Sequence, residues 1–459
     1  MAPTRLDMPT PGARMRLVGY SLPAIPLAIM IVPVTALIPI YYTDEFGFSL
    51  TTVGAILLIA RLFDVITDPV VGVLSDRTRH SAGRRRPWMI AGAPVLVLGV
   101  FILFAPPVAP NSLYLLGAAL LTYGGWTLIQ IPYWSWGAEI AQEYDARAIV
   151  SGYRETAMIF GIAAASLAPV IASQFGHGID RTTMFWLAVM VAVLTPVAIL
   201  IAARSFSEET VYEANDRAWS SILAVFRRNP PFRHLLFTFA IIELGKGAAV
   251  SVTAYFLTYY FRQPELIGLV LLLPYLCIIA SAPLWVALSK RIGKHRAVAI
   301  SLLSAALTLM CIAFLDRDDG YVFLALECIV GLAAGGFAVL PTAIVADVAD
   351  YFADETDGDT AIGAHFASWS LVRKFVQAGS IGMALPLLSL IGFNPNNDPE
   401  INVTATKWIF IGLSTPFYFL GVVLMLKFPL TKAVHDAIRQ RLEGRRNSAP
   451  SKERADYGH

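Results

Sequence analysis

The sequence predicts an all-α membrane protein whose helices cross the bilayer in two halves of six. Hydrophobic residues make up 56% of its 459 residues and charged residues only 15%, and the mean hydropathy of +0.61 lies far from that of soluble domains. The apolar residues fall into runs of about 20 or more, the length of a helix that crosses roughly 30 Å of hydrocarbon. A third observation is the uneven distribution of lysine and arginine between the loops.

Twelve such apolar runs follow one another along the chain. A transmembrane β-barrel is excluded, because its strands would be alternating segments of about 10 residues. The first run exceeds the apolar part of a signal peptide and lacks a small-residue cleavage pattern, so we expect it to be a retained span. The expected helices occupy residues 17–42, 50–74, 88–106, 112–138, 148–173, 184–203, 234–260, 266–289, 296–315, 320–346, 361–392 and 406–428.

Basic residues gather in alternate loops. The loops at 76–87, 204–233 and 290–296 hold five, five and four lysines or arginines, whereas the intervening loops hold single ones or none. Because positively charged loops remain in the cytoplasm, both termini are expected there. We therefore predict a multi-pass integral protein of the bacterial inner (plasma) membrane.

The longest internal polar segment divides the spans six and six. The expected organisation is an N-terminal half (1–203), a cytoplasmic linker (204–233), a C-terminal half (234–428) and a cytoplasmic tail (429–459). Both halves carry a Ser-(Asp/Lys)-Arg sequence followed by glycine and a basic cluster, which is a weak repeat of about 210 residues. Two such halves rocking about a central site are typical of secondary transporters. The alternative is that cytoplasmic turns commonly contain glycine and arginine.

Three charged residues lie inside the second expected span. Arg61, Asp64 and Asp68 are spaced i, i+3, i+7 and share one helical face, with the Thr67 hydroxyl beside them. Each such charge costs about 2.5–3.5 kcal/mol at the bilayer centre, so each needs a partner or a task. Two carboxylates and a hydroxyl can bind a small cation or share a proton. The alternative is that Arg61 forms a purely structural ion pair.

A series of motifs along most of the chain resembles one family. The second span and its following loop read Arg61…Asp64…Asp68-Pro69…Gly72…Asp76, then Ser81-x-Gly83-Arg84-x-Arg86-Pro87-Trp88. Further matches in order are Tyr41-Tyr42-Thr43-Asp44, Ile131-Pro132-Tyr133-Trp134-Ser135, Tyr153-Arg154, Leu340-Pro341…Asp347…Asp350-Tyr351 and Lys374. This set resembles the glycoside-pentoside-hexuronide:cation symporters of the major facilitator superfamily. The resemblance implies the twelve-helix major facilitator fold and cation-coupled sugar transport.

The resemblance also implies roles for single residues. Asp64 and Asp68 would bind the coupling cation, Thr127 of the fourth span would add an oxygen, and Lys374 would lie close to them. Thr67 stands where the family's melibiose carrier has an amide, which leaves sodium, lithium and protons open as the ion. Lys374 has a physical argument of its own, since an ammonium in an apolar helix needs acids nearby. The alternative is a structural lysine.

The fourth expected span presents a continuous aromatic and polar face formed by Tyr123, Trp126, Thr127, Gln130 and Trp134. Aromatic rings suit the C–H faces of a sugar, and Gln130 can bond its hydroxyls. The resemblance adds Arg154 as a residue that lines the cavity. The acids on which the melibiose carrier depends correspond here to Ala28 and Gln130, which argues against the same mode of sugar binding. The alternative for each aromatic residue is ordinary helix packing.

An acidic loop at 347–359, which includes Asp347 and Asp350, is expected to close a cytoplasmic gate against the loop at 76–87. The latter contributes Asp76, Arg84 and Arg86. The alternative is a merely solvated loop.

Four further ionisable residues occur in the C-terminal half. Glu243 and Lys246, spaced i, i+3, form either a self-compensating ion pair or a substrate-binding feature. Glu327 and His365 are expected near span ends, within reach of water, and receive no role.

The resulting hypothesis is a secondary transporter that carries a glycoside or related small molecule with Na⁺ or H⁺. The alternatives are a lysolipid or other amphiphile carrier of the same fold and a non-transporting sensor. No enzyme activity, cofactor or structural metal is expected, because the spans lack paired His/Glu metal spacing and protease arrangements. Nucleic acid and nucleotide are not expected as partners, and no G-x-x-x-x-G-K-[ST] loop occurs. The lipid bilayer is the expected surrounding.

Overall fold

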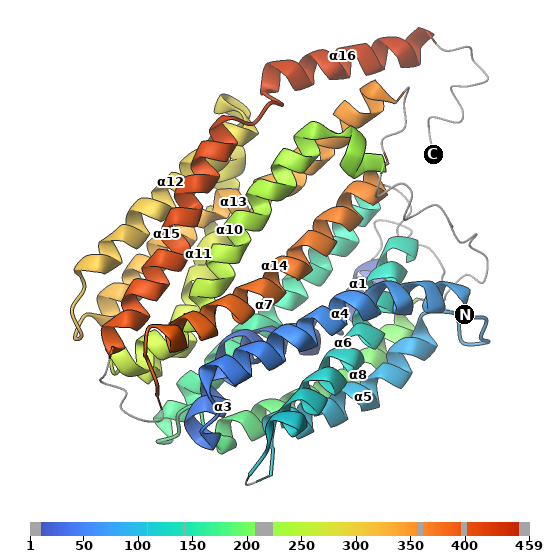
Figure 1. The fold of residues 1–459 in the computed structure, drawn as a ribbon. Helices are drawn as coiled ribbons and strands as arrows, with labels where there is room; N and C mark the ends of the chain where they lie inside the picture. The colour runs from blue at the N-terminus through green and yellow to red at the C-terminus, as the bar shows by residue number, and fades with distance from the viewer. Residues whose placement is uncertain are drawn as a thin grey trace.

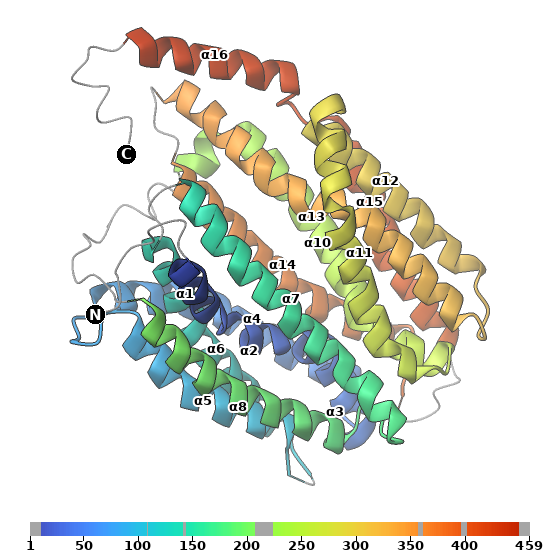
Figure 2. The same ribbon diagram turned by 180° about the vertical axis from the view of Figure 1, so that it is seen from behind.

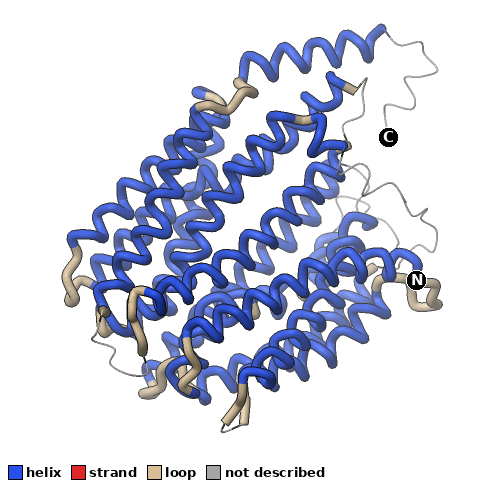
Figure 3. The backbone as a smooth tube through the Cα atoms, viewed as in Figure 1, coloured by secondary structure: helices blue, strands red, loops and turns tan. Residues whose placement is uncertain are grey.

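The computed structural model describes residues 11–107, 109–140, 144–206, 224–356, 361–395 and 402–448, and within them all regular secondary structure is helical (Figure 3). The first half contains α1 (Pro11–Ser21), α2 (Ala24–Ile29), the π-helix η1 (Pro33–Leu37), α3 (Ile38–Phe46), α4 (Leu50–Arg77), α5 (Arg86–Phe104), α6 (Ser112–Ile140), α7 (Tyr144–Gln174) and α8 (Arg181–Ser205). The second contains α10 (Pro230–Tyr255), η2 (Phe256–Tyr260), η3 (Pro264–Leu266), α11 (Ile267–Ile292), α12 (Lys294–Cys311), η4 (Ile312–Phe314), α13 (Gly320–Glu355), α14 (Ile362–Leu390), α15 (Val403–Leu426) and α16 (Lys432–Ser448).

The two groups of helices form two bundles that lie side by side (Figures 1 and 2). The start of α1 and the helix α16 lie at the same end of the molecule, and α16 runs across that end (Figure 1). In the described residues, eleven helices are long and apolar enough to cross a membrane. The helix α14, which coincides with the eleventh expected span, has 29 residues, contains Arg373 and Lys374, and is not among these eleven.

Prolines divide the first span, which the sequence analysis treated as one helix. Pro23 separates α1 from α2, and Pro33 begins the π-helical turn η1 before α3. Proline lacks the backbone N–H that an α-helix needs and clashes with the preceding turn, so it kinks a helix. The span therefore bends around its neighbours, and residues such as Tyr41 and Tyr42 at its far end are fully buried.

The segment at 347–359 is a correction to the sequence analysis, because α13 continues as a helix to Glu355 instead of ending in a loop. Apolar residues repeat on one side of this extension, and Val348, Ala349, Phe352 and Ala353 are all buried. A helix-period apolar stripe that packs on neighbouring helices favours continued helix over loop. Residues 357–360, and 207–223 of the expected linker, lie outside the described part of the chain.

The bundles meet chiefly through two helix pairs, α4 with α14 and α7 with α11, and α10 also contacts η1 and α3. Glycines make the approach close: a Cβ at Gly54 would lie 3.1 Å from Leu385, and a Cβ at Gly268 would overlap the backbone carbonyl of Ser166. Near these contacts the hydroxyls of Thr43 and Tyr255, both fully buried, are 3.0 Å apart. These contacts lie at the end opposite the termini, so the bundles are joined at that end.

The glycine contact generates a prediction about the carrier's conformations. Gly268→Ala should favour the state in which this end is open, because the added methyl group cannot fit against a backbone atom in the closed state. The measurement is the labelling of Thr43→Cys, a position that is fully buried in this conformation, by a membrane-impermeant thiol reagent in protein whose three native cysteines have been replaced. Labelling should rise in Gly268→Ala. Gly117→Ala is the control, because a Cβ there meets nothing within 4 Å, and equal labelling in both variants would contradict the prediction.

Candidate functional site

A cluster of charged side chains joins the two halves at mid-depth. Asp64 lies fourteen residues into α4 and Lys374 twelve residues into α14, about 21 and 18 Å along their helices. The Lys374 ammonium lies 3.2 Å from Asp64 Oδ2 and also contacts Asp68 Oδ2. One ammonium from the second half therefore bridges two carboxylates of the first.

Each oxygen of the two carboxylates has a distinct environment. The Thr127 hydroxyl on α6 donates a hydrogen bond of 2.7 Å to Asp64 Oδ1. The Arg61 guanidinium lies 3.7 Å from Asp64 Oδ2, which it shares with Lys374. The other oxygen of Asp68, Oδ1, is buried without a hydrogen-bond partner among the described residues. A buried carboxylate oxygen without a donor is a position where a cation or a proton can bind.

Thr67 does not join this cluster. Its hydroxyl donates to the backbone carbonyls of Phe63 and Asp64, at 3.0 and 3.2 Å. Threonine within a helix readily forms such bonds to the preceding turn. Sequence spacing places Thr67 beside the acids, but the chosen rotamer turns its hydroxyl towards its own helix.

Arginine covers the first part of the aromatic face expected on α6. Tyr123 and Trp126 stack with ring centroids 6.1 Å apart, and both are buried. The guanidinium carbon of Arg61 lies 4.8 Å from the Tyr123 centroid and 5.7 Å from that of Trp126. Arg61 therefore has two kinds of neighbour, a carboxylate and two π-faces.

The rest of this face lines a cavity of only about 10 Å³, to which Trp126, Gln130, Trp134 and Ala28 contribute. Such a cavity has room for about one water molecule and not for a sugar. Arg154 covers Trp134, with its guanidinium carbon 5.2 Å from a ring centroid. The structure thus brings together the expected substrate residues on α6 and α7, but in a closed arrangement.

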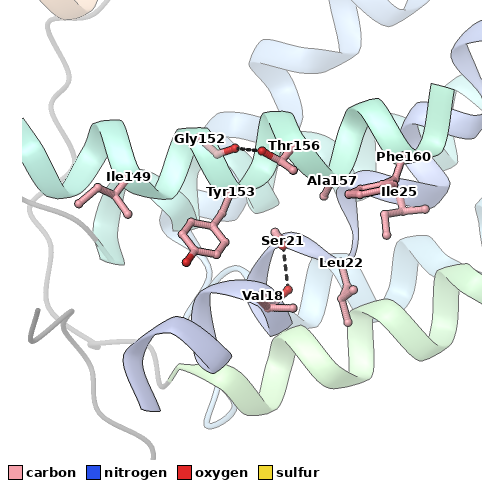
Figure 4. Close-up of a pocket in the computed structure, with 10 residues that line it drawn as sticks. All are labelled: Val18, Ser21, Leu22, Ile25, Ile149, Gly152, Tyr153, Thr156, Ala157 and Phe160. Carbon is pink, nitrogen blue, oxygen red and sulfur yellow. Dashed lines mark hydrogen bonds between the residues drawn. The ribbon is translucent and has the colours of Figure 1, made fainter. Parts of the chain in front are cut away.

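A larger cavity of about 650 Å³ lies between α1, α2 and α7 (Figure 4). Its wall on α7 includes Gly152, Thr156 and Phe160, which lie on the side of the helix opposite Arg154 and Met158. Since those two residues face α6, the cavity opens away from the centre of the molecule. Its walls are mostly apolar, with hydroxyl groups from Ser21, Tyr153 and Thr156, and none of the expected substrate residues lines it.

The expected gate residues of the first half pair within that half. Arg84 Nη2 lies 2.7 Å from Glu139 Oε1 on α6, and Arg86 lies over an aromatic ring of the same helix. Arg85, which is buried, contacts Asp76 and lies 2.8 Å from Glu139. The sequence analysis named Arg84 and Arg86 and missed the central Arg85 and Glu139, because a run of three arginines does not reveal which one turns inward.

The acidic residues of α13 likewise find partners in the second half. Lys294 Nζ on α12 lies 2.6 Å from Asp347 Oδ1, and His435 Nε2 on α16 lies 3.0 Å from Asp350 Oδ2. A third contact joins Asp354 to an arginine of α16 at 2.6 Å. The basic helix α16 is therefore fixed to the acidic end of α13.

These pairings mean that, within the described residues, the expected gate contact between 347–359 and 76–87 does not form in this conformation. Each charge cluster already has counter-charges in its own half. A gate between Asp76, Arg84, Arg86, Asp347 and Asp350 stays a prediction for a conformation in which this end closes.

Two other ionisable groups have definite environments. Glu243 and Lys246 form an ion pair of 3.1 Å on α10, the first of the two alternatives for them. His365 is fully buried, which corrects the expectation that water reaches it. Its Nε2 lies 3.0 Å from Asn229 Nδ2, and its Nδ1 lies 3.0 Å from the carbonyl of Ala361. The His365 side chain lies near a span end, and helices α10 and α13 cover it there.

Comparisons with known proteins bear on this geometry. The glucuronide carrier protein homolog of Escherichia coli is 25% identical over 403 residues, which cover 85% of this chain and 87% of that protein. The sodium-dependent lysophosphatidylcholine symporter 1 of Gallus gallus is 23% identical over an alignment that covers 91% of this chain and 87% of that protein. Among solved structures, a mutant of the nucleoside transporter NupG superposes with a TM-score of 0.68 at 11% identity, covering 90% of this chain and 99% of that chain. The last comparison shows the fold alone.

The model of one family matches nearly the whole membrane part of the chain. That family is described as MFS/sugar transport protein, and the match extends from residue 19 to 432. It confirms the resemblance drawn from the motifs and the expected class of integral membrane protein. This chain belongs to the MFS/sugar transport protein family.

Proposed function

We propose that this transporter carries a glycoside or a related small sugar across the membrane together with a cation that binds at Asp64 and Asp68. Its family and fold are those of transporters, not of enzymes. The observation that carries the proposal is the ammonium of Lys374, which bridges the two carboxylates across the interface between the halves. Buried acids at such an interface couple ion binding to movement of the halves.

In this mechanism Lys374 takes the place of the cation when the carrier holds no ion. Two carboxylates with Arg61 and Lys374 are electrically neutral together, so the empty carrier can change conformation without exposing net charge to the membrane. An arriving Na⁺ or H⁺ binds to Oδ1 of Asp68, and the Lys374 ammonium then leaves the Asp68 carboxylate. Each unit charge moved inward gains about 2.3 kcal/mol per 100 mV, which drives accumulation of the sugar.

Two arginines lie on the aromatic rings, and their position supports a substrate site that opens in another conformation. Arg61 lies on Tyr123 and Trp126, and Arg154 lies on Trp134. A sugar ring that stacks on these aromatic residues must move the guanidinium groups aside. Arg61 also forms an ion pair with Asp64, and an ion bound at the carboxylates weakens this pair. Arg61 can then move away from the aromatic rings, so ion binding favours sugar binding.

A second candidate is the transport of an amphiphile such as a lysolipid. The cavity of about 650 Å³ between α1, α2 and α7 favours it, since its apolar walls face the side of the bundle and suit an acyl chain. The relative from Gallus gallus is named a lysophosphatidylcholine symporter. The cation site plays the same part in both proposals, and only the cargo differs.

Uptake into energised proteoliposomes tests the proposal. Of a panel of labelled glycosides, pentosides, uronides and lysophosphatidylcholine, one sugar should accumulate under an imposed sodium or proton gradient. Asp68→Asn should abolish this accumulation, because the amide cannot replace the negative charge that binds the cation. Asp318→Asn, on an exposed turn, is the matched control and should transport as the unmodified protein does.

Three results would change the interpretation of this experiment. Accumulation that persists in Asp68→Asn contradicts the cation site. Uptake of the lysolipid and of no sugar selects the second candidate. Binding of a sugar without accumulation indicates a sensor.

Removal of the ammonium gives a second prediction. Lys374→Met leaves two buried carboxylates with Arg61 alone, and breaking such a pair typically costs about 3–5 kcal/mol. A cation that replaces the lost ammonium recovers part of this stability. The melting temperature of the variant should therefore rise in sodium relative to choline, or on lowering the pH if the ion is a proton, and it should rise more than that of the unmodified protein. A melting temperature indifferent to both would contradict the proposed exchange between Lys374 and the ion.

A further inference from the structure

A carboxyl group outside the cation site has one buried oxygen. Glu327 is seven residues from the start of α13, about 10 Å along the helix and inside the span. Its Oε1 is buried, and no residue in the described part of the chain forms a hydrogen bond with that oxygen. The residue as a whole is half-buried, so its expected contact with water stays a prediction.

The titratable groups named near Glu327 lie on α15, on α11 and on α13 itself. Tyr418 on α15, which is 3% exposed, lies within electrostatic reach of both Glu327 and Glu243. Cys328, its neighbour in sequence, lies against Cys277 of α11. None of these groups supplies a positive charge to Glu327.

The lysine of this region is already engaged. Lys246 Nζ lies 3.1 Å from Glu243 Oε1, and its side chain is 43% exposed while that of Glu243 is 12% exposed. One ammonium therefore pairs with only one of the two carboxylates near Tyr418. The group formed by Glu327, Tyr418, Glu243 and Lys246 is here called the C-half cluster.

An ionised carboxylate without a partner is strongly disfavoured in a membrane interior, whereas its protonated form is not. A metal ion is a poor substitute for the proton here. Hard cations need several oxygen ligands, and no group of three or more His, Cys, Asp or Glu in the described residues could hold one. Glu327 offers a single carboxyl group, and a single carboxyl group suits a proton.

We propose that Glu327 is a proton-binding site of the second half, separate from the cation site at Asp64 and Asp68. In this conformation the carboxyl group is protonated. Loss of that proton leaves two carboxylates within electrostatic reach of Tyr418, and of the groups named above Lys246 alone carries a positive charge. The carrier therefore releases the proton only in a state that opens the C-half cluster to water, which makes proton exchange dependent on conformation.

The first test needs no transported substrate and uses the proton itself as the probe. Infrared difference spectra of the full-length protein in lipid, recorded during a pH titration, report the carbonyl stretch of each protonated carboxyl group. A band present at neutral pH should be lost in Glu327→Gln and retained in both Glu155→Gln and Asp68→Asn. Glutamine has the shape of the protonated acid, so this variant should fold. A band that remains in Glu327→Gln shows that Glu327 is ionised and overturns the proposal.

The second test rests on the proposed function and uses the sugar found by the uptake panel. Uptake driven by a pH gradient should be lost in Glu327→Gln, while uptake driven by a sodium gradient should remain. Asp68→Asn should lose uptake under both gradients, which distinguishes the cation site from Glu327. If no solute is transported at all, the proposed function fails while the infrared test of Glu327 still stands. If Glu327→Gln leaves pH-driven uptake unchanged, the proton site plays no part in transport and this proposal is overturned.

Discussion

The shared ammonium of Lys374 is the interaction on which the rest of this carrier depends. It is the contact that holds opposite charges from the two halves together in a region where water does not screen them. Removing either side leaves a buried charge without compensation, so the pair fixes how α14 lies against α4. Lys374, Arg61 and the two carboxylates thus neutralise one another at one place between α4 and α14.

The same sharing of charges extends to the neighbouring aromatic residues. Arg61 and Arg154 lie on the rings that a sugar would use, and each also contacts a carboxylate. In the proposed mechanism an ion at Asp64 and Asp68 and a sugar on the rings would both displace Arg61, whereas Arg154 pairs with Glu155 outside that site. Coupling between two ligands requires that they act on one shared equilibrium, and Arg61 is the residue proposed to connect them.

Much of the architecture follows from the sequence, because a lipid environment restricts the chain to helices of a narrow range of length. The apolar runs locate the spans, and the positions of Asp64 and Asp68 on one helical face locate the candidate site. Side-chain rotamers and tertiary partners could not be predicted from the sequence in this way. The inward turn of Arg85, the backbone bond of Thr67 and the burial of His365 depend on packing between helices distant in sequence, and no local pattern encodes them. The pairing of Asp350 with His435 was missed for the same reason, since α16 returns to α13 from 85 residues away.

The glycine contacts at the joined end have a consequence for what must break when that end opens. Contacts such as Gly54 on Leu385 and Gly268 on Ser166 are backbone-close, and the hydrogen bond between the Thr43 and Tyr255 hydroxyls accompanies them. Separating such surfaces costs dispersion energy and one neutral hydrogen bond, and these contacts include no buried charge that would lose its partner. The end with the termini holds ion pairs within each half instead. The two ends of the carrier therefore differ in the kind of contact that a change of conformation has to rearrange.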